Sequence, residues 1–536
     1  MLDQTDCAAA PSAALPDYAH RRTFAIISHP DAGKTTLTEK LLLASGAIRM
    51  AGHVKARGER RRTRSDWMEI EQQRGISVTS SVMTFERDGI VFNLLDTPGH
   101  SDFSEDTYRT LSAVDAAVMV IDAAKGIESQ TRKLFEVCRL RDIPFFTFIN
   151  KVDREGLDPL ELMDEISATL ALDLTPFTWP IGMGTDFRGL IDVKGKRALF
   201  AEERGGLLTR IVPFETPEDL IGLDGVEARI LEPAVESLAL ALGILPHFEL
   251  DSFREGHLSP VFFGSAIKEA GVAELLAGLG TFGPAPLPRK ASSRIIAPQE
   301  NAVAGFVFKV QANMDPNHRD RVAFVRLCSG TFKRGMKLYN AREKRHMAIA
   351  NPIFFFAQER ETVDEAVAGD IIGIPNHGML RVGDTLSEGE VIRFEGIPDF
   401  APEILRRVLL SDPMKAKQLS KALQDMAEEG VVQVLRPVSD PAPIVGVVGT
   451  LQLEVLSSRL EKEYGVPIRY EPVSFVTARW IIGERTELDR FIDTSRSSIA
   501  RDRDDAPVYL ARSQWVLDRA IEEWPKLKFV AVKERG

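Results

Sequence analysis

The stretch Phe24-Ala-Ile-Ile-Ser-His-Pro-Asp-Ala-Gly-Lys-Thr-Thr36 decides the fold class of this 536-residue chain. Its apolar start predicts a buried strand, and the residues that follow predict a tight loop and the opening of a helix. Gly33 lets the backbone approach a phosphate group, and the helix N-terminus adds positive potential. We expect Lys34 to reach the β- and γ-phosphates of a nucleotide and the Thr35 hydroxyl to bind Mg²⁺. Ser28 stands where loops of the GxxxxGK[ST] type have their first glycine, so this stretch alone leaves an unrelated strand and loop open.

The second motif, Asn93-Leu-Leu-Asp-Thr-Pro-Gly-His100, ends the next apolar strand. An aspartate at a strand end, here Asp96, can bind Mg²⁺ through water, and Gly99 can offer its N–H to a γ-phosphate. A strand followed by an ordinary Pro-Gly turn would have the same residues. That alternative does not explain why the motif follows a phosphate loop by one strand.

The third motif, Phe146-Thr-Phe-Ile-Asn-Lys-Val-Asp153, carries groups that fit guanine. The Asp153 carboxylate can accept hydrogen bonds from the guanine N1–H and 2-amino groups, which adenine lacks. Asn150 can address the O6/N7 edge of the base, and the aliphatic stem of Lys151 can pack on it. Gly264-Ser-Ala266 follows another apolar run and fits a fourth loop that contacts the base. Four motifs in this order predict a domain that binds GTP or GDP.

A long insert separates the first two motifs and ends in Gln73-Arg-Gly-Ile-Ser77. The Ser77 hydroxyl is a candidate Mg²⁺ ligand when γ-phosphate is present. The metal ligands expected from the sequence are Thr35, Ser77 and Asp96. The nucleotide-binding residues expected are Ser28, His29, Pro30, Asp31, Ala32, Gly33, Lys34, Thr35, Thr36, Asp96, Thr97, Pro98, Gly99, His100, Asn150, Lys151, Asp153, Ser265 and Ala266.

The same insert contains the basic stretch Lys55-Ala-Arg-Gly-Glu-Arg-Arg-Arg-Thr-Arg64. By itself such a stretch is typical of a solvated surface loop. Its place between the phosphate loop and Ser77 indicates instead a loop that the nucleotide state orders. In that case the stretch would contact a polyanionic partner in the GTP form.

The chain is too long for one hydrophobic core, so about three domains are expected. Apolar runs alternate with helical stretches up to residue 281, which predicts an α/β domain with a mainly parallel sheet over 1–282, of which residues 1–20 are an N-terminal tail. The buried strands expected there are Phe24–Ile27, Ile90–Leu95, Ala116–Ile121, Pro144–Ile149 and Val261–Phe263. A proline-rich stretch predicts a linker at 283–300.

Short β-type segments separated by Gly, Asn and Asp predict a small β-barrel over 301–396. Its expected strands are Ala302–Val310, Arg321–Ser329, Lys337–Tyr339, Ala368–Ile374 and Asp384–Leu386.

An α+β domain is expected over 397–536. Asp412 and Pro413 are typical of the N-cap and first position of a helix, and Gly430 is typical of its end. A strand at Ile444–Val448, a helix at Leu451–Leu460 and a strand at Val466–Tyr470 are expected after it.

Composition limits the function classes. The chain is 44% hydrophobic and 27% charged, as in soluble globular proteins. No apolar run reaches the ~18–20 residues that span a bilayer, and the N-terminus lacks the features of a secretory signal. Three distant cysteines form neither a disulfide framework nor a zinc site, so a cytoplasmic location is expected. The net charge of −11 argues against coating of nucleic acid, although a local basic footprint stays possible.

The motifs resemble those of the translational GTPases. His29-Pro-Asp-Ala-Gly-Lys-Thr-Thr36, Arg74-Gly-Ile-Ser77 and Asp96–His100 are similar to theirs. Val448-Gly-Thr-Leu-Gln-Leu-Glu-Val455 resembles the helix entry in the third domain of elongation factor G and its relatives. The more specific resemblance is to the bacterial peptide-chain release factor three family (class II release factors), through the stretches Ser65–Ser81, Leu410–Lys415 and Val476–Trp480.

This resemblance implies a protein that binds the ribosome after peptide release, hydrolyses GTP there and removes class I release factors. It also implies that His100 orients the attacking water, which makes His100 the expected catalytic residue. No residue of the chain stands out as an arginine finger, so the ribosome would act as activator by fixing His100. The expected partners are the ribosome and class I release factors, without membrane or DNA, and the chain is expected to be monomeric.

Two other functions stay open at this stage. The first is another translational GTPase, such as a translocase-like or ribosome-rescue factor, which would need domains beyond those expected here. The second is a guanine-nucleotide scaffold that does not hydrolyse GTP. The presence of Lys34, Thr35, Asp96 and His100 counts against a scaffold.

Overall fold

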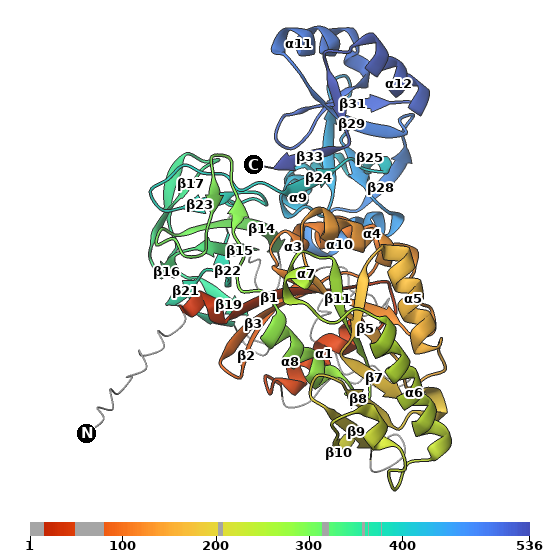
Figure 1. Ribbon diagram of the computed structural model, residues 1–536. Coiled ribbons are helices and arrows are strands. Elements are labelled where there is room, and N and C mark those ends of the chain that lie inside the picture. The colour runs from red at the N-terminus through yellow and green to blue at the C-terminus, as the bar shows by residue number, and fades with distance from the viewer. Residues whose placement is uncertain are drawn as a thin grey trace, which may run out of the picture.

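The computed structural model describes residues 16–48, 80–201, 207–312, 321–355, 360–362, 364–376 and 378–535. In this part of the chain an α/β region is followed by a β-rich region and then by a C-terminal region of strands and helices (Figure 1). The α/β region contacts both of the others.

The α/β region is built on a seven-stranded sheet with the strand order β2-β3-β1-β4-β5-β11-β6. Strands β3, β1, β4, β5, β11 and β6 run parallel, and only β2 pairs antiparallel, at one edge. The bounds are β1 Arg21–Ser28, β2 Ser81–Arg87, β3 Ile90–Asp96, β4 Ala116–Asp122, β5 Phe145–Asn150, β6 Asp173–Pro176 and β11 Leu258–Phe263. All five strands predicted from the sequence are present, and the predicted α/β class is confirmed.

Helices cover both faces of this sheet, because successive side chains of a buried strand point to opposite sides. On one face Ala25 and Ile27 of β1 belong to a core that includes residues of α4 and α5. On the other face Phe24 and Ile26 belong to a core that includes residues of α1 and α8. The helices are α1 Lys34–Ala44, α3 Ser104–Leu111, α4 Ser129–Leu140, α5 Pro159–Leu170 and α8 Val272–Phe282.

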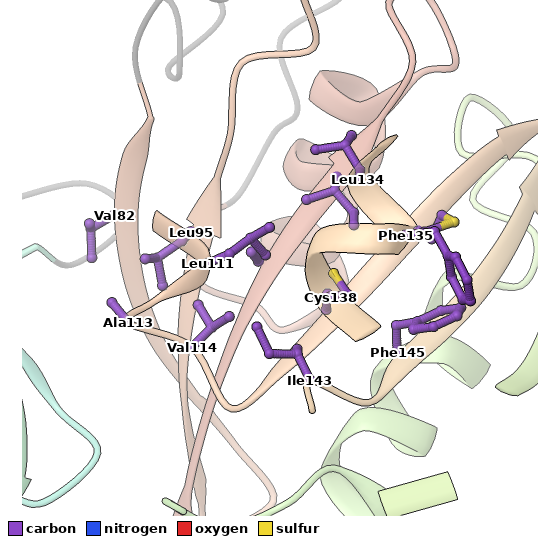
Figure 2. Packing of buried hydrophobic residues seen from close by; sticks show 14 of the residues in the cluster. Val82, Leu95, Leu111, Ala113, Val114, Leu134, Phe135, Cys138, Ile143 and Phe145 are labelled. Carbon is purple, nitrogen blue, oxygen red and sulfur yellow. The ribbon is translucent and has the colours of Figure 1, made fainter. Parts of the chain in front are cut away.

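Figure 2 shows how α4 packs in the first of these cores. Leu134, Phe135 and Cys138 point from the helix towards the sheet, and the Phe135 ring meets Phe145 of β5 edge-on at 5.4 Å between centroids. Burial raises the pKa of the Cys138 thiol to about 12. The thiol therefore behaves as a small apolar group and is not reactive.

An antiparallel unit is inserted between β6 and β11, and the sequence analysis did not anticipate it. Its sheet has the order β10-β9-β8-β7, and α6 packs against β7. The bounds are β7 Thr178–Ile181, β8 Gly189–Asp192, β9 Arg197–Ala201, β10 Leu208–Pro213, α6 Ala228–Ile244 and α7 Leu250–Arg254. The strands are only four to six residues long, and β7 and β8 are buried along their whole length, so they give only a weak periodic signal.

The β-rich region contains an eight-stranded antiparallel sheet with the order β18-β17-β23-β14-β15-β22-β19-β20. All five of its predicted strands are present, as β14, β15, β17, β22 and β23. The bounds are β14 Ala304–Ala312, β15 Arg321–Ser329, β17 Lys337–Asn340, β18 Arg345–Ala348, β19 Ile353–Phe355, β20 Arg360–Thr362, β22 Ile371–Pro375 and β23 Thr385–Ser387. A separate strand pair joins β16 Thr331–Lys333 and β21 Glu365–Val367.

The C-terminal region has two packed halves on one sheet with the order β28-β25-β27-β26-β30-β31-β29-β32. Helices α9 and α10 cover one half, and α11 and α12 cover the other. The helices are α9 Ala416–Glu429, α10 Thr450–Tyr464, α11 Arg485–Thr494 and α12 Gln514–Glu523. The strands are β25 Ile404–Leu410, β26 Gln433–Pro437, β27 Ile444–Val447, β28 Ile468–Pro472, β29 Thr477–Ile482, β30 Ile499–Arg501, β31 Pro507–Ala511 and β32 Lys528–Val530; β24 Ile397–Phe400 pairs separately with β33 Val532–Arg535.

The predicted start of α9 is confirmed with one refinement. Asp412 accepts a hydrogen bond from Met414 N at 3.0 Å and so caps a 3₁₀ turn over Pro413–Lys415 that leads into the helix. Gly430 ends the helix with φ of 79°.

The segment predicted as a linker at 283–300 is more ordered than a connector. It contains the hairpin formed by β12 (Arg289–Lys290) and β13 (Ile295–Ile296). The Leu287 amide and the Arg289 guanidinium both donate to Asp115 Oδ1, at 3.1 and 3.0 Å. The prolines of this segment exclude an interior strand. They do not exclude its attachment to Asp115, because that attachment needs only the Leu287 amide and the Arg289 side chain.

A buried ion pair joins the α/β region to the β-rich region. The Arg326 guanidinium of β15 binds the Asp115 carboxylate, and the two side chains are 1% and 0% exposed. Arg326 Nη1 also donates to the Gly369 carbonyl at 2.6 Å. Thr23 Oγ1 of β1 and Asn93 Nδ2 of β3 donate to the same carbonyl at 2.8 and 3.2 Å.

Gly369 can present its carbonyl in this way because its φ is 100°. That conformation strains any residue with a side chain. An added Cβ would also lie 2.9 Å from Arg21 Cβ.

We expect Arg326→Met to destabilise the protein by about 3 kcal/mol, because it leaves the Asp115 carboxylate buried with one cation fewer. The measurement is urea unfolding followed by tryptophan fluorescence. Arg519→Met is the control, since Arg519 forms an exposed pair with Glu523 on α12 at 2.7 Å and its loss should change stability by less than ~0.5 kcal/mol. Equal midpoints for Arg326→Met and wild type would show that the buried pair does not hold the two regions together.

Candidate nucleotide-binding site

The phosphate loop connects the end of β1 at Ser28 with the start of α1 at Lys34. Two of its residues have positive φ, Asp31 with 64° and Gly33 with 98°. Gly33 is the N-cap residue of α1 and supplies no side-chain cap, so the first-turn amides of α1 are free of a capping side chain. This arrangement suits an anion, because backbone N–H groups and the helix dipole point to the same place.

Lys34 and Asp96 meet under this loop. Lys34 Nζ lies 2.5 Å from Asp96 Oδ1, and both side chains are buried. The parallel pairing of β1 with β3 places Ile26 beside Asp96, and Thr97 Oγ1 donates to the Ile26 carbonyl at 2.7 Å. The first two motifs are therefore joined by strand pairing, a hydrogen bond and an ion pair.

Gly99 brings the second motif against the phosphate loop. A Cβ on Gly99 would lie 3.5 Å from Pro30 Cα and 3.8 Å from the His29 carbonyl. On the other side of the loop, His29 Nε2 lies 3.1 Å from Glu128 Oε1. The two motifs thus form one continuous surface at the carboxyl edge of the sheet.

The groups at this edge fit a magnesium nucleotide. Thr35 is half-buried at the start of α1, and Asp96 ends β3 beside it. Hydroxyl and carboxylate oxygens together with phosphate oxygens are the ligands that Mg²⁺ prefers. Ser77, the third expected ligand, and the basic stretch Lys55–Arg64 lie outside the described residues.

Asn150 ties three loops together on the side where the base is expected. Its Nδ2 donates to the Ala32 carbonyl of the phosphate loop at 2.8 Å, and its Oδ1 accepts from Ala266 N at 2.9 Å. A Cβ on Gly33 would collide with this amide. The sequence analysis assigned Asn150 only to the edge of the base, whereas the side chain is buried and clamps the third motif to the first and the fourth.

Lys151 extends from the end of β5 across the phosphate loop. Its Nζ donates to the Asp31 carbonyl at 2.5 Å and to Asp122 Oδ2 at 2.7 Å. Burial by itself raises the pKa of the Asp122 carboxyl, but the bonds from Lys151 and from the Ala124 amide outweigh it and the pKa lies below its usual value. Asp122 therefore remains a carboxylate that holds the Lys151 stem stretched beside the loop.

Asp153 and Ser265 bring the third and fourth motifs into contact. Ser265 Oγ donates to Asp153 Oδ1 at 2.5 Å, and Ser265 is fully buried. The Val152 amide donates to the Gly264 carbonyl at 3.2 Å, which aligns the two loops. One carboxylate oxygen of Asp153 is thus oriented by Ser265, and this fixes the direction in which the carboxylate can face a base.

His100 follows Gly99 and is partly exposed. Its Nδ1 accepts a hydrogen bond from the Asp102 amide at 3.2 Å, and Asp102 Oδ1 lies 3.3 Å from the same nitrogen. Nδ1 therefore faces Asp102, and Nε2 is the ring nitrogen on the opposite side. The ring edge lies near Phe103, with 6.3 Å between the ring centroids.

Sequence reasoning missed Asp122 and Glu128 as supports of the site. Asp122 ends β4 just as Asp96 ends β3 and Asn150 ends β5. A polar residue at the end of each buried strand was therefore a usable signal for Asp122. Glu128 precedes α4 and had no such signal.

Comparisons with known protein families cover most of the chain. Residues 19–284 match the elongation factor Tu GTP binding domain, and residues 302–389 match elongation factor G domain 2. Residues 394–521 match the C-terminal domain of the class II release factor RF3. The chain belongs to the translational GTPases, of the class II release factor type. The domain at 19–284 gives this GTPase its capacity to bind guanine nucleotide and to hydrolyse GTP.

One solved structure similar to this translational GTPase is the crystal structure of a protein from Thermus thermophilus. The two chains are 26% identical with a TM-score of 0.67, and the match covers 84% of this chain and 67% of the other. Within the described residues, no helix is both long enough and apolar enough to cross a lipid bilayer.

Asp153→Asn should weaken GTP binding by about tenfold or more and improve binding of xanthosine triphosphate. The reason is that an amide replaces one carboxylate acceptor by a donor, which suits the extra carbonyl of xanthine. Direct titration with fluorescent analogues of both nucleotides measures the change. Asp158→Asn, at the exposed N-cap of α5, is the matched control and should leave both affinities as they are. Equal GTP affinity in Asp153→Asn and wild type would remove the base-reading role.

Proposed function

We propose that this protein is a ribosome-dependent GTPase of translation termination, which promotes dissociation of class I release factors after peptide release. The observation that carries the proposal is the match of residues 394–521 to a class II release factor domain, behind a GTP binding domain in the same chain. The protein then acts in the cytoplasm as a monomer, and its partners are the ribosome and a class I release factor.

The residues of the site support hydrolysis by positioning and electrostatics, with little covalent work for the protein. The phosphate loop over 28–36 and Lys34 bind the phosphates. Thr35, Asp96 and Ser77 would hold Mg²⁺, which when bound neutralises charge on the phosphate oxygens. Asn150, Lys151 and Asp153 with Ser265 and Ala266 hold the guanine.

His100 is the residue we assign to the attacking water. Its Nδ1 faces the Asp102 amide and carboxylate, so Nε2 is the ring nitrogen that can hydrogen-bond to water. We assign the ring the role of orienting this water. Gly99 lies between His100 and the phosphate loop and keeps the backbone close to the γ-phosphate position.

The test is the rate of GTP hydrolysis with and without 70S ribosomes that carry a class I release factor. We expect a low rate alone and strong stimulation by these ribosomes, together with faster release of the class I factor. Absence of stimulation would contradict the termination role, and stimulation without factor release would favour another translational GTPase. No hydrolysis in either condition would indicate a scaffold.

In the same assay His100→Ala should lower the stimulated rate by about a hundredfold, the scale of losing a positioned catalytic group, and leave GTP affinity within a few-fold. His257→Ala is the control, because His257 is exposed and lies beyond the site, after α7. Parallel loss of binding and turnover in His100→Ala would instead show a structural role.

The basic stretch gives a separate prediction. Its positive charges are Lys55, Arg57, Arg60, Arg61, Arg62 and Arg64. Replacing Arg60, Arg61 and Arg62 with Ser should weaken ribosome binding chiefly in the GTP form and flatten its salt dependence, since fewer phosphate contacts release fewer counterions. Pelleting with ribosomes and a non-hydrolysable GTP analogue across a salt series measures both effects.

The control for this triple variant replaces Arg485, Arg490 and Arg519 with Ser, which are exposed on α11 and α12. This variant changes the net charge equally, so an equal loss of binding would indicate a general charge effect. Curves of the Arg60–Arg62 variant that superimpose on those of wild type would show that the stretch is only a solvated loop.

A further inference from the structure

Helix α10 of the C-terminal region is capped by a residue of the GTP binding domain. Its own N-cap residue is Gly449, which has no side chain to accept a hydrogen bond from the first turn. Asp102 supplies the missing acceptor, because its Oδ2 accepts from Leu451 N at 2.8 Å. A carboxylate in this position also suits the positive end of the helix dipole.

The contact between Asp102 and α10 requires a residue without a side chain at position 449. A Cβ on Gly449 would overlap the Asp102 carboxylate, although its φ of −140° is open to any residue. Next to Asp102, Phe103 is buried in a small apolar cluster with Val455 and Leu451 of α10. The short turn over 101–103 is therefore held to α10 by a charge-assisted hydrogen bond and by apolar packing.

The same turn holds His100. The Asp102 amide donates to His100 Nδ1, and the Phe103 amide donates to the His100 carbonyl at 3.0 Å. Asp102 thus binds α10 through Oδ2, and it faces His100 Nδ1 with its amide and with Oδ1. A shift of the Asp102 main chain towards or away from α10 moves the amide that contacts the imidazole.

We propose that Asp102 is a positioning residue that couples docking of α10 to the orientation of His100. This proposal rests on the proposed role of His100 in GTP hydrolysis. The docked C-terminal region keeps the turn over 101–103 in place, so that Nδ1 faces Asp102 and Nε2 is the ring nitrogen that can face the attacking water. When α10 leaves, the turn loses its anchor and the imidazole is free to rotate.

The experiment compares Asp102→Ala, Asp102→Asn and Gly449→Ala in ribosome-stimulated GTP hydrolysis. We expect Asp102→Ala to lower kcat about tenfold and to leave KM for GTP and the affinity for GDP within about twofold, because a positioning defect acts on turnover and not on nucleotide binding. Asp102→Asn should keep most of the rate, because the amide oxygen still accepts from Leu451 N. Gly449→Ala should act like Asp102→Ala, although it lies in the other region of the chain.

Two double variants sharpen the test. Gly449→Ala should have no further effect in the Asp102→Ala background, because the methyl group then occupies the space that the carboxylate has left. Asp102→Ala should have no further effect in the His100→Ala background if it acts through the imidazole. Thr450→Ala is the matched control at the same helix end, since its side chain is exposed.

Each outcome decides between the alternatives. Full activity of Asp102→Ala or of Gly449→Ala, while His100→Ala is impaired, overturns the coupling and leaves the proposed function intact. An equal fold loss from Asp102→Ala with and without His100 shows a helix cap that only stabilises the fold, and also overturns it. Full activity of His100→Ala overturns the role of His100 and the coupling with it. If Asp102→Ala does not fold, the single variants Gly449→Ala and Asp102→Asn are compared instead. The proposal then expects a lower rate in Gly449→Ala and a rate close to wild type in Asp102→Asn.

Discussion

The parallel pairing of β1 with its two neighbours is the constraint on which the nucleotide site depends. Because Ile26 lies beside Asp96 on one side and Val118 on the other, the carboxyl ends of these strands reach the same edge of the sheet. The pairing of Asp122 with Asn150 extends this edge by one more strand. Four loops far apart in the sequence therefore meet where helix N-terminal amides are also available. Polar side chains such as Asn150 then lock the loops to one another, so that the site is preorganised before a ligand arrives.

The regions beyond the GTP binding domain are attached through buried polar contacts as well as through apolar packing. The Gly369 carbonyl accepts hydrogen bonds from side chains of β1, β3 and β15. The Asp115 carboxylate binds Arg326 and accepts a hydrogen bond from the segment at 283–300. Breaking such contacts leaves buried charges without partners, which is costly in a low dielectric. Arg109 of α3 makes the corresponding connection to the C-terminal region, because it donates to the Gly430 carbonyl at 2.9 Å and binds Glu105 within its own helix. Because each of these contacts is either formed or broken, they favour a few distinct arrangements of the regions over a continuous range of arrangements.

Much of the fold and of the site could be predicted from the sequence, because strands, caps and phosphate loops depend on local patterns. The strands leading into the three motifs, the cap at Asp412 and the helix end at Gly430 are examples. Long-range partners could not be predicted in the same way. Nothing in the residues around Asn150 indicates that its amide would face Ala32 and Ala266, and nothing near Gly449 indicates that a carboxylate 349 residues away along the chain would approach Leu451. These contacts follow from the packing of whole elements, which periodicity does not encode. The antiparallel insert over β7–β10 was not predicted for a different reason, which is that its short strands carry little periodic signal.

The buried Asp115 carboxylate has a consequence for the order in which this protein forms. Its two cationic partners come 174 and 211 residues later in the chain, at Arg289 and Arg326. During synthesis the N-terminal domain folds first, so it forms with this carboxylate still hydrated at its surface. The carboxylate loses its water only when the later segments arrive with their guanidinium groups. The nascent domain therefore has a charged surface at this place, where an exposed apolar surface would promote aggregation. The same carboxylate later binds the guanidinium groups of Arg289 and Arg326.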